Sequence, residues 1–168
     1  MVRHELCAEA IRLTRVVRAL MPDEPEVAGL LSLMLLQHSR RDTRTGPGGE
    51  LVLLDEQDRT LWRREEIAEG IGLVRHLPPG PYALQAAIAA EHARAPTAKA
   101  TDRLRIAELY ELLARAAPGP VVELNRAVAV ALAEGEERGL ELMEGLDDRL
   151  DGYHLLHSAR ADLLRRLG

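Results

Sequence analysis

Polar residues that can form hydrogen bonds and ion pairs interrupt an otherwise apolar stretch late in the sequence. Glu123, Asn125 and Arg126 lie in an expected helix at 121–133, whose other positions are mainly Val, Leu and Ala. Asn125 is the only Asn in the chain, and Asn is unfavourable inside a helix unless its amide has partners. The three side chains either fix the register of neighbouring helices or contact a partner on the concave face of a helical array.

Two further helices carry comparable polar residues. Tyr82, Gln85 and His92 form a similar set on an expected helix at 82–94, and the same two interpretations apply to them. His157 and Arg160 lie on the last expected helix, at 153–167. The predicted partner-binding residues are therefore Tyr82, Gln85, His92, Glu123, Asn125, Arg126, His157 and Arg160.

Catalytic and metal-binding patterns are weak by comparison. His154 and His157 have a helical spacing that could ligate a metal, but only Asp162 supports such a site, so packing between helices is the favoured interpretation. No Ser-His-Asp order, nucleophile elbow or cofactor fingerprint is present. We therefore expect no enzymatic activity, no catalytic residue, no cofactor and no metal.

The composition favours an all-α fold. The chain has no Phe and one Trp, so Leu and Ala must build the core, and both residues favour helices. The net charge of −5 argues against a protein that binds nucleic acid unaided, because phosphate contacts need a basic face. The longest apolar run, 27–36, is too short to span a bilayer, which needs about 20 residues. A cytoplasmic protein without a membrane contact is expected.

Clusters of Pro and Gly divide the chain into helices. The expected helices cover 2–20, 25–40, 61–77, 82–94, 101–117, 121–133, 136–145 and 153–167. In the first, Leu6, Ala10, Leu13, Val17 and Leu20 form an apolar stripe along one face. The pattern predicts an N-terminal helical subdomain at 1–77, with an irregular insert at 41–58, followed by helix pairs at 78–168.

The insert has its own pattern of apolar and acidic residues. Leu51–Leu54 is either a short extended segment or a loop that its leucines pin to the core. The acidic residues that follow, Asp55, Glu56 and Asp58, are expected in a solvated turn. Asp58 or Thr60 is expected to cap the next helix.

A short sequence pattern that recurs in the second half of the chain predicts a solenoid. Asn125-Arg126-Ala127-Val128 and Ser158-Ala159-Arg160-Ala161 lie about 33 residues apart, the period of helix pairs in tetratricopeptide-type arrays. We expect an all-α array of helical hairpins, with a tetratricopeptide-like right-handed solenoid in the C-terminal half. The last pair is incomplete at Gly168, so a homodimer through the bare face is left open as an alternative.

Several strings, taken in order, resemble a known family. They are Pro22-Asp23-Glu24-Pro25-Glu26-Val27, Gly49-Glu50-Leu51-Val52-Leu53-Leu54, Gln57-Asp58-Arg59 with Trp62, Gly80-Pro81-Tyr82, Leu124-Asn125-Arg126-Ala127-Val128-Ala129 and Gly152-Tyr153-His154-Leu155-Leu156-His157. Over essentially the whole chain, this order resembles the C-terminal tetratricopeptide-like extension of extracytoplasmic-function RNA polymerase sigma factors. One departure is Arg103, which stands where that family usually places a Trp.

The resemblance implies a role in regulating transcription initiation through protein–protein contacts. The core sigma domains are absent from these residues, so the parent protein would contact DNA only through its missing N-terminal domains. The implied partners are the sigma core domains of the same polypeptide, the RNA polymerase core or a signalling protein. An alternative is a helical domain that senses a small molecule in a pocket lined by Tyr82, His92, Glu123 and Arg126.

Overall fold

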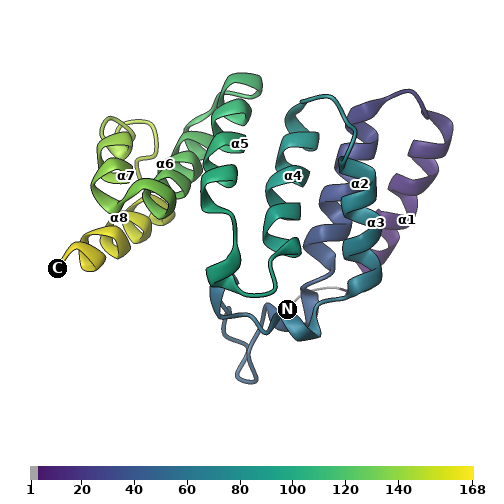
Figure 1. Ribbon diagram of the computed structural model, residues 1–168, viewed down its shortest axis with the longest axis horizontal. Helices are drawn as coiled ribbons and strands as arrows, with labels where there is room; N and C mark the ends of the chain where they lie inside the picture. The colour runs from purple at the N-terminus through teal and green to yellow at the C-terminus, as the bar shows by residue number, and fades with distance from the viewer. Residues whose placement is uncertain (1–3) are drawn as a thin grey trace. The chain divides into compact units, whose positions relative to one another are not determined.

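The computed structural model describes residues 4–168, which form eight α-helices and four short 3-10 helices without a β-strand (Figure 1). The α-helices are α1 (His4–Leu20), α2 (Pro25–His38), α3 (Arg64–Val74), α4 (Pro81–Arg94), α5 (Arg103–Ala116), α6 (Pro120–Glu134), α7 (Glu136–Met143) and α8 (His154–Leu167). The 3-10 helices are η1 (Arg41–Thr43), η2 (Leu54–Glu56), η3 (Arg59–Leu61) and η4 (Ala98–Ala100). The predicted all-α array is therefore confirmed. The expected start of the first helix, Val2, lies outside the described residues.

The chain divides into two compact units, one up to Thr101 and the other from Asp102 to Gly168. The boundary predicted after residue 77 falls inside the first unit, because α4 packs extensively against α2.

Helix α2 lies at the centre of the first unit and contacts α1, α3 and α4 (Figure 1). Its sequence is apolar almost all round, as a central helix requires, and Leu31 and Leu35 are each only 1% exposed. Gly29 permits the close approach of α4, because a Cβ at this position would lie 2.7 Å from the backbone nitrogen of Ala83. Pro25 occupies the first turn, where its missing N–H leaves no intrahelical bond unmade.

The second unit is built from neighbours in sequence. Helix α5 packs on α6, α6 on α7 and α7 on α8, and α8 also contacts α6. Its buried core consists of Leu124, Ala127, Ala131, Met143, Leu146, Leu150, Leu156 and Leu163. Gly135 separates α6 from α7 at a positive φ of 120°, a conformation that favours glycine.

One expected helix begins later than the sequence indicates. The pattern predicts a helix over 61–77, but α3 begins at Arg64 and a 3-10 turn precedes it. Asp58 caps that turn, because its carboxylate accepts the N–H of Thr60 at 2.9 Å. The first residue of α3 follows Arg63, which makes no side-chain capping bond.

Candidate protein-interaction surfaces

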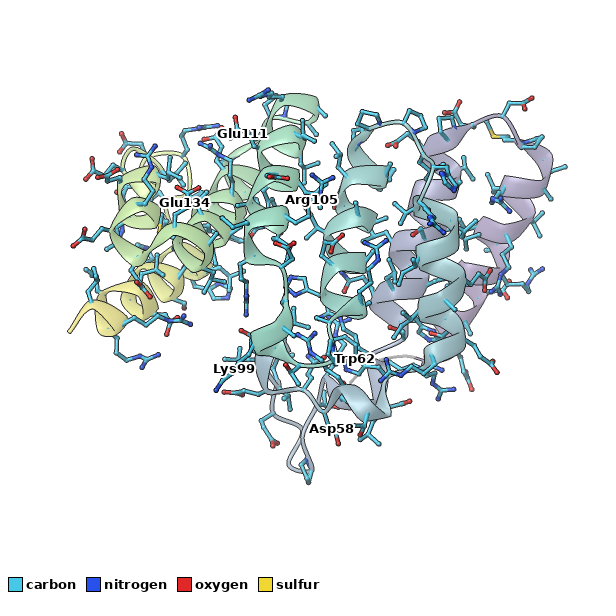
Figure 2. All side chains as sticks on the ribbon, viewed as in Figure 1. Asp58, Trp62, Lys99, Arg105, Glu111 and Glu134 are labelled. Atoms are coloured by element: carbon cyan, nitrogen blue, oxygen red, sulfur yellow. The ribbon has the colours of Figure 1, made fainter. Side chains whose placement is uncertain are left out.

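The irregular segment between α2 and α3 is anchored at its end by Trp62. The indole is only 3% exposed, and its Nε1 donates a hydrogen bond to Thr43 Oγ1 at 3.0 Å. Figure 2 shows Trp62 close to the helices of its unit and Asp58 farther out on the segment. The ring packs in a cluster with buried residues of α2, α3 and α4, so the end of the segment has a fixed position.

Arg59 forms the second anchor. Its side chain is buried, and its Nη1 donates to the carbonyl oxygens of His92 at 2.6 Å and Ala95 at 3.0 Å. Its Nη2 donates to Thr101 Oγ1 at 3.3 Å. The guanidinium also lies over the ring of Trp62, 5.0 Å from its centroid. Arg59 thereby ties the irregular segment to the C-terminal end of α4.

Most residues of the segment ahead of these anchors are at least partly exposed, although Thr43 and Gln57 are buried. We call residues 50–58 the acidic segment, because they include Glu50, Asp55, Glu56 and Asp58 and no basic residue. A narrow hairpin closed by the single bridge between Thr45 and Leu51 extends away from the helices of this unit (Figure 1). Glu50 lies on this hairpin, and Asp55, Glu56 and Asp58 follow it along the chain.

Two leucines of the acidic segment face solvent. Leu51 is 73% exposed and Leu53 is 61% exposed, whereas Val52 and Leu54 are half-buried. This alternation is typical of extended backbone, in which successive side chains point to opposite sides. Of the two predicted alternatives, the extended segment describes Leu51–Leu53, and only Leu54 packs against the core.

The predicted residues of α4 differ in their environment. Tyr82 is 43% exposed, whereas Gln85 is half-buried and its Nε2 donates to the carbonyl of Pro81 at 3.1 Å. His92 is half-buried, and its carbonyl accepts the bond from Arg59. Tyr82 is therefore exposed, whereas the side chain of Gln85 and the carbonyl of His92 bond within the first unit.

The charged residues predicted on α6 form ion pairs with other elements. Arg126 Nη1 lies 2.6 Å from Glu111 Oε2 on α5, and Glu123 Oε2 lies 2.5 Å from Nη1 of Arg149, which follows α7. Arg115 and Arg126 both lower the pKa of Glu111 below its usual value by donating hydrogen bonds to its carboxylate. These contacts correspond to the first interpretation, in which Glu123 and Arg126 fix the register of the array.

Asn125 has a different environment from its neighbours on α6. Its side chain is exposed, and it has no hydrogen-bond partner among residues 4–168. The requirement that a mid-helix Asn have protein partners is therefore not met here; an exposed amide can be satisfied by solvent instead.

On α8, Arg160 is paired and His157 is not. Arg160 binds the carboxylate of Asp147 through two bonds of 2.8 and 3.1 Å and donates to the carbonyl of Met143 at 3.3 Å. This pairing lowers the pKa of Asp147 and raises that of Arg160. His157 is exposed and makes no hydrogen bond within the described part of the chain.

The structure thus separates the predicted residues into two groups. Tyr82, Gln85 and His92 belong to the first unit, and the remaining five belong to the second. The second unit also has an open depression of about 380 Å³ where α6 meets α7, lined mainly by Glu134, Glu136, Glu137, Arg138 and Glu141. None of the predicted residues lines it.

The surface residues that sequence reasoning missed are the partners of those it selected. Glu111, Asp147 and Arg149 complete the ion pairs of the second unit. Each lies in an ordinary surface pattern of charges, so the sequence contains no signal that distinguishes it. The exposure of Leu51 and Leu53 also had no signal, because 51–54 is apolar at every position.

Two searches of residues 4–168 found neither a metal-binding group nor a membrane span. No three His, Cys, Asp or Glu side chains of this part gather so that they could hold a metal ion. None of its helices combines the length and apolar character needed to cross a bilayer.

Comparison with known proteins links the chain to relatives without an assigned role. An uncharacterized protein of Rhizobium meliloti (strain 1021) is 50% identical over 171 residues, which cover 99% of this chain and 40% of the relative. The chain therefore spans about 40% of the length of the curated relative that it matches. No solved structure gives a significant match. Residues 1–78 match a family described as "Family of unknown function (DUF6596)".

Proposed function

We propose that the chain is a regulatory, protein-interacting domain of an extracytoplasmic-function RNA polymerase sigma factor and that it modulates transcription initiation in the cytoplasm. The ordered strings that resemble the C-terminal extension of such factors support this role. Its partners are the sigma core domains, the RNA polymerase core or a signalling protein. No catalytic step is assigned to it.

The observation that carries the proposal is the exposed acidic segment. Leu51 and Leu53 are 73% and 61% exposed, and residues 50–58 include four acidic residues and no basic one. Exposed apolar side chains beside charges of one sign are typical of a surface that docks a protein of the opposite charge. The acidic segment therefore suits a basic partner surface with apolar side chains.

This chemistry suggests how the domain would act on transcription. Protein surfaces that contact promoter DNA are basic, because they neutralise phosphates. An acidic segment that docks on such a surface would compete with DNA for it. The anchors Trp62 and Arg59 hold the base of the segment in place, which reduces the entropy lost on docking. In this mechanism the domain restrains promoter binding until a signal or a partner displaces it.

A binding experiment tests the proposal. The full chain would be immobilised and exposed separately to core RNA polymerase and to the DNA-binding domains of its parent sigma factor. We expect capture of the sigma domains, and at least a tenfold loss of affinity when Leu51→Ser and Leu53→Ser are combined. The matched control combines Leu104→Ser and Leu155→Ser, two leucines that are 61% and 47% exposed on the second unit.

The outcomes separate the proposed role from its alternatives. Capture of polymerase alone would show that the domain does not compete with promoter DNA for the sigma domains. It would instead indicate that the domain adds a contact to the polymerase. Failure of the wild-type chain to bind either protein would overturn the proposed contact with the transcription machinery and leave a signalling protein or a small molecule as the partner. A rise in melting temperature with a metabolite would then favour a small-molecule sensor, because a ligand that binds only the folded form stabilises it.

A further inference from the structure

Two arginines flank the short 3-10 helix η1. Arg40 precedes this helix and Arg44 follows it, and both residues are half-buried. The Nη2 of Arg40 donates a hydrogen bond to Oε1 of Gln37, which is an uncharged acceptor. In the described part of the chain, no carboxylate forms an ion pair with Arg40 or Arg44. Acidic side chains of residues 4–168 therefore leave both positive charges without a counter-charge.

Other half-buried arginines of the chain are neutralised by a carboxylate. Arg41, Arg126 and Arg160 have a carboxylate oxygen at 2.9, 2.6 and 2.8 Å, respectively. This pairing is the usual one, because a charge that is partly removed from water costs free energy unless a partner compensates it. Arg40 and Arg44 depart from the pattern, which indicates that their counter-ion comes from outside these residues.

A third arginine, Arg59, lies beside this pair. Thr43 links the two parts, because its Oγ1 lies 3.0 Å from the carbonyl oxygen of Arg40 and accepts the indole N–H of Trp62 at 3.0 Å. The guanidinium of Arg59 lies over that indole. Burial, and then the positive charges of Arg44 and Arg59, lower the pKa of Arg40 to about 10. We call Arg40, Arg44 and Arg59 the arginine cluster.

The backbone supplies only part of the missing negative charge. Arg40 follows the C-terminal end of α2, and a helix C-terminus is equivalent to about half of a negative elementary charge. The two charges of Arg40 and Arg44 are therefore offset by roughly a quarter, and more than one positive charge remains. A single carboxylate would leave part of it uncompensated, whereas a phosphate group carries about 1.5 to 2 negative charges at pH 7.

We propose that the arginine cluster is a binding site for a phosphate group, free or carried by a small molecule, with Arg40 and Arg44 as its ligands. The planar guanidinium presents N–H donors in a fork that matches two phosphate oxygens. Arg59 adds positive charge, while its Nη atoms stay bonded to neutral oxygens of the fold. The carbonyl of Arg44 accepts the N–H of Val52 at 3.0 Å, so the site lies at the base of the acidic segment.

Thermal unfolding of the full chain in inorganic phosphate, against chloride at equal ionic strength, tests the site. We expect phosphate to raise the melting temperature along a saturating curve, because a ligand that binds only the folded form stabilises it. The curve gives a dissociation constant, which should increase roughly tenfold or more in Arg44→Gln, since a charge-assisted bidentate contact is lost. Arg40→Gln is the second variant, with the same expected result.

The matched control is Arg75→Gln, which removes an exposed arginine at the end of α3 in the same unit. It should respond to phosphate as the wild type does. A general salting effect of phosphate would not saturate and would be equal in all variants.

The stability of Arg44→Gln in chloride is a second readout. We expect its melting temperature to exceed that of the wild type, because the substitution removes a charge that repels Arg40. A residue with a purely structural role would give the opposite sign. Circular dichroism checks that each variant is folded.

Two further probes separate the sources of the phosphate. Glycerol phosphate should stabilise the wild type if the site accepts a phosphate carried by a small molecule, and only inorganic phosphate should do so if the site takes the free ion. Acetate should have little effect, because it carries one charge.

Three results would overturn the proposal. They are the absence of a saturable response to either phosphate probe, an equal response in Arg44→Gln and the wild type, and an equal response to acetate. None involves a sigma factor or polymerase, so the outcome stands apart from that of the proposed function.

Discussion

The carboxylate of Glu26 accepts the backbone N–H of Tyr82 at 2.8 Å, and its other oxygen accepts that of Ala83 at 3.3 Å. Both N–H groups lie in the first turn of α4, where backbone donors have no partner within the helix. The cap residue of α4 is Gly80, which has no side chain to offer. A residue near the start of α2 thus caps a helix that begins far along the chain.

Removing this cap should destabilise the first unit. We expect Glu26→Ala to lower the free energy of unfolding by about 1 kcal/mol, the usual effect of losing a helix cap. Urea unfolding followed by the fluorescence of Trp62, the only Trp in the chain, measures this change. Glu24→Ala serves as control, because Glu24 is exposed and makes no capping bond; an equal loss in both variants would contradict the assignment.

Two glycines should tolerate no side chain. A Cβ at Gly29 would lie 2.7 Å from the nitrogen of Ala83, and one at Gly139 would lie 2.3 Å from the Cβ of Ala131. We expect Gly29→Ala and Gly139→Ala to destabilise the protein by about 1–3 kcal/mol through overpacking. At Gly72, which is exposed on α3 with no atom within 4 Å of the added Cβ, alanine should stabilise by roughly 0.5–1 kcal/mol. Chemical denaturation monitored by circular dichroism would reveal whether the signs differ as expected.

The hydrogen-bonding geometry of the Arg59 guanidinium should contribute more to stability than its positive charge. Lysine keeps the charge but cannot reach the carbonyls of His92 and Ala95 and Thr101 Oγ1 together. We expect Arg59→Lys to lower the free energy of unfolding by about 1–3 kcal/mol, because buried acceptors lose their donors. The control Arg63→Lys alters an exposed ion pair with Asp42 and should have little effect. Equal melting temperatures for the two variants would show that Arg59 is not an anchor.

His38 should make stability depend on pH. Burial, helped by the charges of Arg41 and Arg63, lowers its pKa below the usual 6.5, although Glu66 opposes the change. Its Nδ1 lies 3.1 Å from Glu66 Oε2 and 3.0 Å from Arg41 Nη1. The unfolded chain therefore takes up the proton first as the pH falls, so stability is full above pH 6.5 and declines from there toward the folded-state pKa.

Thermal unfolding between pH 8 and pH 5 provides the measurement. Replacement by Gln, His38→Gln, should flatten the decline in melting temperature below pH 6.5, whereas His76→Gln, at an exposed position, should leave it unchanged. Carboxylates with a lowered pKa, such as Glu111 and Asp147, lose their contribution only below their ordinary values of 4.5 and 3.8. If the melting temperature of His38→Gln fell with pH as steeply as that of the wild type, the pH dependence would arise from other groups.

Most helices and several of their ends could be predicted from the sequence because their causes are local. Pro25 begins α2, the carboxylate of Asp102 caps α5 by accepting the N–H of Arg105, and Gly135 ends α6. Each of these effects acts within one helical turn, so the residues nearby suffice to recognise it. The late start of α3 was not predicted, because Asp58 can cap either an α-helix or a 3-10 turn. In the structure it caps the 3-10 turn at 59–61.

The sequence by itself therefore determined the helical class, the approximate helix ranges and the polar positions at which contacts were expected. Tertiary structure decided which of those side chains form ion pairs within the chain. Arg126 and Arg160 pair with Glu111 and Asp147, whereas Asn125 is exposed. It also decided that α1 buries Ile11 and leaves Leu13 in solvent. The physical reason is that the spacing of apolar residues shows which side chains share a face of one helix. Which face is buried, and which charges pair, depends on the positions of elements far away in the sequence.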